Sequence, residues 1–244
     1  MKDYLIDSHC HLHDLEYYEG EKDEVLKRAH EFGVKKLITI GTDPEDSLVA
    51  RDFCMNHDDV YWSYGVHPEY AKKYQEMSLP EKRDKLVAIG EVGLDYHYGL
   101  DSRKEQIALL ENILQVAQDE KIPVIFHVRE AFDDFWPILA NFHLAGSVLH
   151  SFSDNKKNLK KGLENGCYIG VNGLATFATL PMAPLEKILL ETDAPFLTPK
   201  PFRGKVNEPG YVKYVADWLA EKTGLSLQEI YDITTKNTEK LFEI

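Results

Sequence analysis

Eight short runs rich in β-branched and apolar residues recur along the chain, and stretches with helical spacing separate them. Such alternation is typical of βα units around a parallel sheet. Runs such as LVAIG and PVIF are hydrophobic throughout, which indicates strands buried on both faces. Eight strands within 244 residues favour a closed barrel over an open sheet. The expected strands are Tyr4 to Ser8, Lys36 to Gly41, Val60 to Gly65, Leu86 to Glu91, Val124 to Val128, Ser147 to His150, Tyr168 to Val171 and Ile188 to Thr192.

Amphipathic segments between and after these strands predict the helices. The segment from Gly173 to Pro184 carries two prolines, so we expect the seventh helix to be abbreviated or replaced by a loop. No low-complexity run or linker interrupts the pattern, and residues 1–244 are therefore expected to form one α/β domain, a (β/α)8 TIM barrel. The expected helices are Asp23 to Phe32, Pro44 to His57, Lys104 to Glu120, Phe132 to Phe142, Asn155 to Asn165, Tyr211 to Lys222 and Ser226 to Phe242.

Charge and composition limit the classes of function. The chain has 28 basic and 41 acidic residues, and a net charge of -13 argues against broad electrostatic binding to nucleic acid. Bound metal ions can still supply the positive charge that a phosphodiester needs. No apolar run approaches the roughly 20 residues of a membrane span, and the first residues lack a signal-peptide pattern, so we expect a cytoplasmic protein. The three scattered cysteines indicate reduced thiols.

Histidines and carboxylates stand at the predicted ends of the strands. His9 and His11 are two residues apart at the end of the first strand, so both imidazoles point to the same face. The carboxyl ends of all strands in a parallel barrel meet at one mouth, where active sites are built. Four imidazoles and two carboxylates are more ligands than one tetrahedral ion binds, but they suit two divalent ions that share a carboxylate. The six residues are His9, His11, Glu91, His127, His150 and Asp193.

A series of motifs along nearly the whole chain resembles the TatD family of metal-dependent deoxyribonucleases, within the wider amidohydrolase-type barrels. The segment after Phe177 is shorter than this family's pattern, and Glu130 stands where an aspartate is usual. The matching motifs are DSHCHL (7–12), GVHP (65–68), GEVGLDYH (90–97), FHVREA (126–131), LHSFS (149–153), ETDAPFL (191–197), RGKVNEP (203–209) and TTKNTEKLF (234–242).

The resemblance implies a role for each of the six residues. His9, His11 and Asp193 would bind one metal ion, His127 and His150 the other, and Glu91 would bridge them. Asp193 would also act as the general base that accepts a proton from metal-bound water. The cofactors are then two divalent ions per chain, among Mg, Mn, Zn and Ni, and imidazole and carboxylate ligands do not choose between them. The expected substrate is DNA, cleaved from the 3′ end of single strands.

Further residues at the predicted mouth are candidates for substrate contacts. His67 either contacts a phosphate or closes a turn, and Arg129 either pairs with a phosphate or orients a carboxylate. Arg203 and Lys205 follow Asp193 in a loop where a guanidinium can grip a phosphate with two hydrogen bonds. Asp95 and Tyr96 are expected to hold a metal ligand from outside, or to form turn structure. Tyr17 and Tyr18 either stack on a base or pack in their loop.

Two other functions remain compatible with the sequence. The same dinuclear barrel can hydrolyse amide or ester bonds in a small molecule or an aminoacylated RNA. A noncatalytic metal-binding scaffold is the third possibility, although it predicts an incomplete ligand set. A nuclease requires phosphate contacts beyond the metal ions, whereas an amide hydrolase is expected to have a closed pocket. No motif implies a protein partner, and we expect a monomer.

Overall fold

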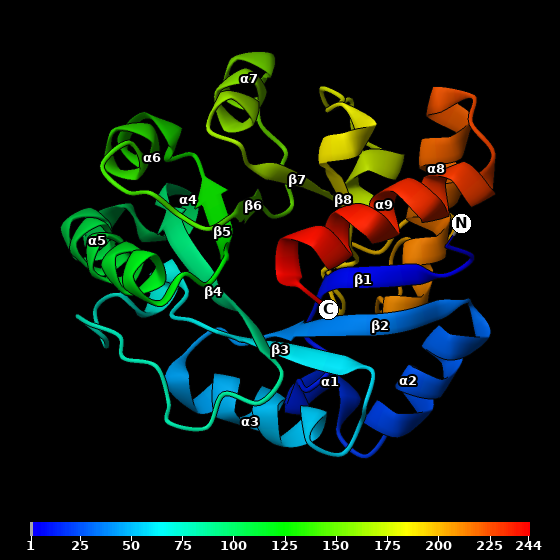
Figure 1. The fold of residues 1–244 in the computed structure, drawn as a ribbon, viewed down its shortest axis with the longest axis horizontal. Coiled ribbons are helices and arrows are strands. Elements are labelled where there is room, and N and C mark those ends of the chain that lie inside the picture. The colour runs from blue at the N-terminus through cyan, green and yellow to red at the C-terminus, as the bar shows by residue number, and fades with distance from the viewer. Residues whose placement is uncertain (1) are drawn as a thin grey trace.

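The computed structural model describes residues 2–244, except for the side chain of Leu15, and its strands form one parallel sheet. The strands follow one another around the sheet in chain order, from β1 to β8 (Figure 1). A bridge between Cys10 and Ala194 joins the two edges, which confirms the predicted (β/α)8 barrel. The strands are β1 (Leu5–Cys10), β2 (Val34–Ile40), β3 (Val60–Tyr64), β4 (Leu86–Asp95), β5 (Val124–Arg129), β6 (Ser147–Leu149), β7 (Tyr168–Val171) and β8 (Ile188–Leu190).

Helices surround the barrel (Figure 1). Between β7 and β8 the described chain forms only short 3-10 turns, Gly173–Thr176 and Leu185–Lys187. This confirms the prediction that the helix between these two strands is abbreviated or replaced by a loop. Two short helices were not expected, α1 (Leu15–Tyr18) and α4 (Tyr96–Gly99). The longer helices are α2 (Lys22–Glu31), α3 (Pro44–Cys54), α5 (Arg103–Glu120), α6 (Phe132–Leu139), α7 (Lys156–Glu164), α8 (Val212–Thr223) and α9 (Leu227–Phe242). No helix in residues 2–244 is long and apolar enough to cross a membrane.

Two hydrophobic cores follow from the alternation of side chains along the strands. The larger core packs outward-facing strand residues, among them the buried Cys10, against the helices. The smaller core joins side chains from β2 and β4 to β8, including Ile38 and Ile125, and fills the barrel interior. Leu241 and Phe242, at the end of α9, belong to this inner core. Apolar packing therefore fills one end of the barrel, and polar side chains gather at the other.

Strand β4 differs from the sequence prediction. Glu91 was expected to end the strand, but β4 continues to Asp95 and stays paired with β5. The pairing shifts in register after Ile89, and Gly93 then passes so close to β5 that a Cβ there would lie 1.8 Å from the carbonyl oxygen of His127. The register shift is an irregularity that hydrophobic periodicity does not reveal. Glu91 consequently projects into the mouth from within a strand.

Candidate metal centre

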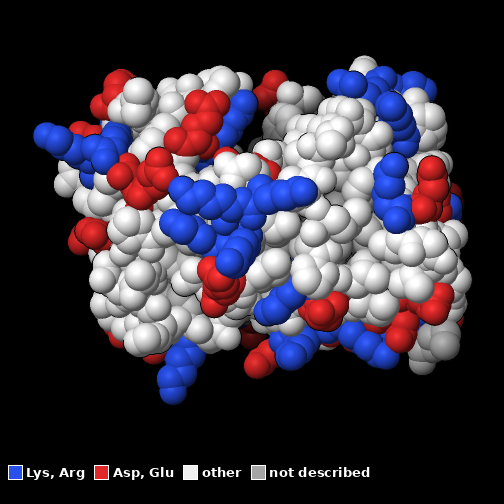
Figure 2. Space-filling model, turned by 90° about the horizontal axis from the view of Figure 1, so that it is seen from above, with Lys and Arg blue, Asp and Glu red and all other residues white. Residues whose placement is uncertain are grey.

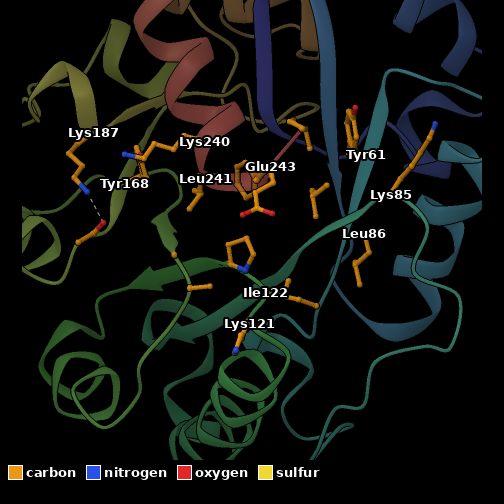
Figure 3. Close-up of a pocket in the computed structure, with 17 residues that line it drawn as sticks. Tyr61, Lys85, Leu86, Lys121, Ile122, Tyr168, Lys187, Lys240, Leu241 and Glu243 are labelled. Carbon is orange, nitrogen blue, oxygen red and sulfur yellow. Dashed lines mark hydrogen bonds between the residues drawn. The ribbon is translucent and has the colours of Figure 1, made fainter.

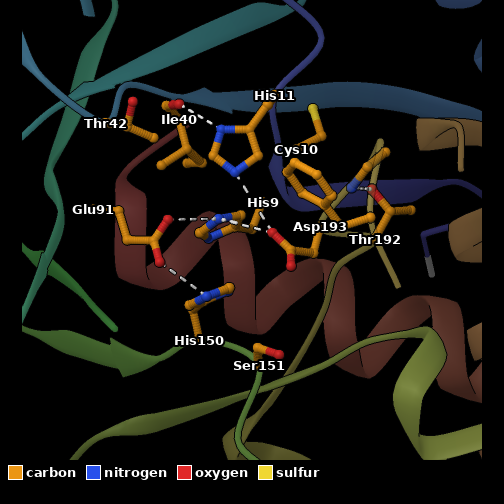
Figure 4. Close-up of polar contacts among 12 residues, drawn as sticks. His9, Cys10, His11, Ile40, Thr42, Glu91, His150, Ser151, Thr192 and Asp193 are labelled. Carbon is orange, nitrogen blue, oxygen red and sulfur yellow. Dashed lines mark hydrogen bonds and ion pairs between the residues drawn. The ribbon is translucent and has the colours of Figure 1, made fainter. Parts of the chain in front are cut away.

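Five polar side chains from four separate regions converge at the mouth of the barrel. His9 lies in β1 and His11 directly follows it, and Glu91 lies in β4. His150 directly follows β6, and Asp193 lies in the loop after β8 (Figure 4). The nitrogen Nε2 of His9 lies 3.5 Å from Glu91 Oε2 and 3.5 Å from Asp193 Oδ1. His11 Nε2 lies 3.5 Å from the same Asp193 oxygen, and His150 Nε2 lies 3.0 Å from Glu91 Oε1.

These side chains form overlapping groups that are compact enough to hold an ion. His9 belongs to two of the groups and Glu91 to two, so the groups share ligands rather than stand apart. His127 and His150, which the resemblance assigns to one ion, fall in different groups, and His67 joins the group of His127. The three groups are His9, His11 and Asp193; His9, Glu91 and His150; and His67, Glu91 and His127.

The environment of His9 fits a metal ligand. Its side chain is buried, yet neither ring nitrogen has a hydrogen-bond partner among the described residues. Two ligand atoms about 2.1 Å from a common tetrahedral ion lie roughly 3.4 Å apart, and the 3.5 Å separations around Asp193 match this spacing. His11 is held in place by a 2.9 Å hydrogen bond between Nδ1 and the carbonyl oxygen of Ile40, which leaves Nε2 facing Asp193. The first group therefore has both the spacing and the orientation for an ion.

His127 is placed differently. Its Nδ1 lies 2.7 Å from Glu91 Oε1 and its Nε2 lies 2.9 Å from Asp95 Oδ2, so both ring nitrogens already have partners. His127 would have to exchange one of these contacts to bind an ion. Asp95, which the sequence suggested as a support for a ligand, does contact a candidate ligand and also caps α4.

The pKa shifts of Glu91, Asp193 and His9 favour the protonation states that bind a cation, whereas that of His127 does not. Burial alone would raise the pKa of Glu91, but the imidazoles of His150, His127 and His9 hold it well below its usual value. Burial likewise opposes ionisation of Asp193, yet the hydrogen bond from His11 and the nearby imidazoles lower its pKa. Burial lowers the pKa of His9, which keeps its imidazole neutral and its lone pair free for a cation. Despite burial, the bonds to Asp95 and Glu91 raise the pKa of His127 to about 8.

Two buried carboxylates that the sequence analysis did not single out support the ligands. Asp7 accepts hydrogen bonds from the backbone nitrogen (2.9 Å) and hydroxyl (2.5 Å) of Thr192, and so ties the strand that carries His9 to the segment that carries Asp193. Glu191 Oε1 accepts a 2.7 Å hydrogen bond from the backbone nitrogen of Ser151 and lies 3.5 Å from His150 Nδ1.

A buried asparagine organises the loop after β8. Asn207 Nδ2 donates hydrogen bonds to the carbonyl oxygens of Thr192, at 3.0 Å, and Phe196, at 2.6 Å. Its backbone nitrogen donates to the carbonyl oxygen of Pro195. These bonds fix both ends of the turn that contains Asp193. A signal for the three supporting residues was present, because Asp7, Glu191 and Asn207 all stand within the quoted motifs.

The predicted substrate contacts divide into two groups. His67 and Arg129 line a cavity of about 630 Å³ that is also lined by the candidate ligands other than His9. Arg203 and Lys205 are absent from its lining: the Arg203 guanidinium lies 3.8 Å from the ring centre of Phe177, and the Lys205 ammonium lies over another phenylalanine. Tyr96 does not hold a ligand either, because its hydroxyl donates a 2.6 Å hydrogen bond to Asp134.

Positive charge gathers away from the centre. A second cavity, of about 710 Å³, lies at the opposite end of the barrel beside the end of α9, and Lys85, Lys121, Lys187 and Lys240 line it (Figure 3). That end of such barrels serves stability rather than chemistry. Figure 2 shows another group of basic side chains on the face that carries α7, a helix whose lysines Lys156, Lys157 and Lys160 are exposed.

The barrel and its cluster of imidazoles and carboxylates define a metal-dependent hydrolase, and comparison with known proteins agrees. Residues 6–243 match the family described as TatD related DNase, and the chain belongs to this family. It is 34% identical to YabD of Bacillus subtilis, named a metal-dependent hydrolase, over 98% of this chain and 99% of the relative. It is 33% identical to the 3′-5′ ssDNA/RNA exonuclease TatD of Citrobacter rodentium, over 92% of each chain. The crystal structure of the Escherichia coli TatD homolog YJJV superposes with a TM-score of 0.92, at 30% identity and 98% coverage of both chains.

Proposed function

We propose that this chain is a two-ion nuclease that removes nucleotides from the 3′ end of single-stranded DNA. The observation that carries the proposal is the buried, unpartnered imidazole of His9 between the carboxylates of Glu91 and Asp193. Relatives named as ssDNA/RNA exonucleases supply the substrate class. Residues 1–244 would act as one domain, as a monomer in the cytoplasm.

The proposed assignment of ligands to ions is the one that the family resemblance implies, and the compact group of His9, His11 and Asp193 supports its first half. His9, His11 and Asp193 would hold one divalent ion, His127 and His150 the second, and Glu91 would bridge both. Two such ions lower the pKa of bound water and neutralise the phosphate oxygens. Asp193 would accept the proton of the attacking water, because its carboxylate lies 3.5 Å from both His9 and His11 and so stands where that water would bind.

The remaining residues of the cavity would position the substrate. Arg129 and His67 line the mouth and would hold phosphate oxygens, and Asp95 would keep His127 in its orientation. The -13 net charge makes the metal ions the main source of attraction for a nucleic acid. We therefore expect binding to DNA to be weak in the absence of divalent ions.

Hydrolysis of an amide or ester in a smaller substrate is a second candidate, which the positions of Arg203 and Lys205 favour. Neither side chain lines the cavity, so the predicted phosphate contacts beyond the metal centre reduce to Arg129 and His67. An aminoacyl ester of RNA requires fewer phosphate contacts than a DNA strand does. The two candidates share the metal centre and differ in the bond that is cleaved and in the phosphate contacts that the substrate requires.

The proposal is tested on metal-stripped protein to which Mg, Mn, Zn or Ni is returned separately. Single-stranded DNA labelled at its 5′ end reports a ladder that shortens from the 3′ end, and Glu91→Gln controls for contaminating nucleases. The proposal predicts a metal-dependent ladder that the variant does not produce. Intact DNA under all four metals, together with hydrolysis of an aminoacyl ester, would establish the second candidate instead.

A further inference from the structure

Exposed aromatic side chains stand beside the metal centre. Phe196 is 47% exposed, although its side chain is large and apolar, and it lines the cavity at the metal centre. Tyr17, 43% exposed, packs edge-to-face against it with ring centres 5.7 Å apart. A large apolar ring that remains this exposed at the mouth of a site, rather than in the core, is available to a ligand.

Phe196 is also held firmly in place. Its backbone nitrogen donates a 2.8 Å hydrogen bond to the carbonyl oxygen of Asp193, and its own carbonyl accepts the bond from Asn207. The ring centre lies 6.2 Å from that of His11, a candidate ligand, in an edge-to-face arrangement. The same short turn thus fixes the carboxylate of Asp193 and the Phe196 ring relative to each other.

We infer that Phe196, braced by Tyr17, is a stacking surface for the nucleobase next to the scissile phosphate. The inference rests on the proposed nuclease function and adds a recognition site to it. Every nucleobase has a flat π face, so an aromatic ring binds bases without selecting a sequence. The ring lies one side chain away from the metal ligands, so a base stacked on it would bring the adjoining phosphate toward the ions. Tyr17 serves as the edge-to-face support that limits rotation of the Phe196 ring.

Stacking predicts a specific loss when the base is absent. Alanine substitution of a ring that stacks on one base reduces single-strand binding by about tenfold or more. We therefore compare an intact single-stranded DNA with two versions that carry an abasic tetrahydrofuran nucleotide at the last or at the next-to-last 3′ position. These two nucleosides flank the bond that a 3′ exonuclease cleaves first. The protein should have about tenfold lower kcat/KM for one of the two abasic strands than for the intact strand.

Variants assign that difference to the ring. Phe196→Leu keeps an apolar side chain but removes the π face. The ratio of kcat/KM for the intact strand to kcat/KM for the abasic strand should therefore fall to about one in this variant, whereas Phe196→Trp should retain the ratio of the parent protein. Met55→Ala removes an equally exposed apolar side chain outside the cavity and should leave the ratio unchanged. Titration with Mn²⁺ shows whether Phe196→Leu still binds metal as the parent protein does.

The outcomes separate the inference from the proposed function. Cleavage of all three strands at equal efficiency, or a ratio that persists in Phe196→Leu, overturns the stacking surface while the nuclease function stands. Failure of the metal-loaded parent protein to cleave any strand overturns the nuclease function and the stacking surface together.

Discussion

Replacement of Glu191 by glutamine should weaken metal binding without unfolding the barrel. The glutamine oxygen can still accept the hydrogen bonds from the backbone nitrogen of Ser151 and from Asn172 Nδ2 that Glu191 Oε1 now accepts. The negative charge 3.5 Å from His150 Nδ1 disappears, however, and with it the group that orients this ligand. Loss of such a supporting carboxylate typically costs 10- to 100-fold in metal affinity, or roughly 1.4 to 2.7 kcal/mol.

Calorimetric titration of metal-stripped protein with Mn²⁺ measures this loss directly. Glu186→Gln is the matched control, because Glu186 is exposed outside the cavity. Gly170→Ala perturbs the same carboxylate by another route, since a Cβ at Gly170 would lie 2.3 Å from Glu191 Oε2. Unchanged Mn²⁺ affinity in both Glu191→Gln and Gly170→Ala would refute the role of Glu191 in orienting His150.

Three other substitutions test separate parts of the account. Asn207→Ala leaves two carbonyl oxygens without their buried donor, so urea unfolding should show a loss of about 2 to 4 kcal/mol, and a loss below about 0.5 kcal/mol would contradict this. Arg129 lines the cavity and Arg203 does not, so Arg129→Ala should raise KM for single-stranded DNA by about tenfold and Arg203→Ala by less than about threefold. A larger effect of Arg203→Ala would show that the cavity is not the DNA site. Mn²⁺ at 100 times its dissociation constant should stabilise the parent protein by about 2.7 kcal/mol for each bound ion and His9→Ala by less, and equal stabilisation of both would place the ions elsewhere.

The sequence predicted the barrel and the convergence of its polar residues for a simple geometric reason. Near-continuous hydrophobic runs fix the strands, and strand direction alone places their carboxyl ends at one mouth. His9, His11, Glu91, His150 and Asp193 are therefore found together although they span most of the chain. Their roles as ligands of particular ions remain a proposal, because proximity does not assign each ligand to an ion.

Side-chain direction in loops could not be predicted in the same way. Arg203 lies near Asp193 in sequence, but the loop turns its guanidinium onto Phe177 and out of the cavity. Tyr96 begins a short helix, and this placement directs its hydroxyl to Asp134. Periodicity carries no information about such turns.

The supporting residues were missed for another physical reason. Asp7, Glu191 and Asn207 each act through backbone groups or through a second side chain, and their partners lie far away in the sequence. The contact of Asp7 exists only once β1 and β8 have come together, and that of Asn207 only once the loop after β8 has folded. The extension of β4 beyond Glu91 was missed because a register shift leaves no trace in the hydrophobic pattern.

The central claim, that Glu91 bridges two ions which together support hydrolysis, is tested most directly by the amount of metal that activity requires. Mn²⁺ is returned to metal-stripped protein in steps, and cleavage of single-stranded DNA is measured at each step for the parent protein and for Glu91→Gln. The account predicts that activity saturates at two equivalents per chain and is absent from the variant at every step. Saturation at one equivalent, or undiminished turnover in Glu91→Gln, would contradict it.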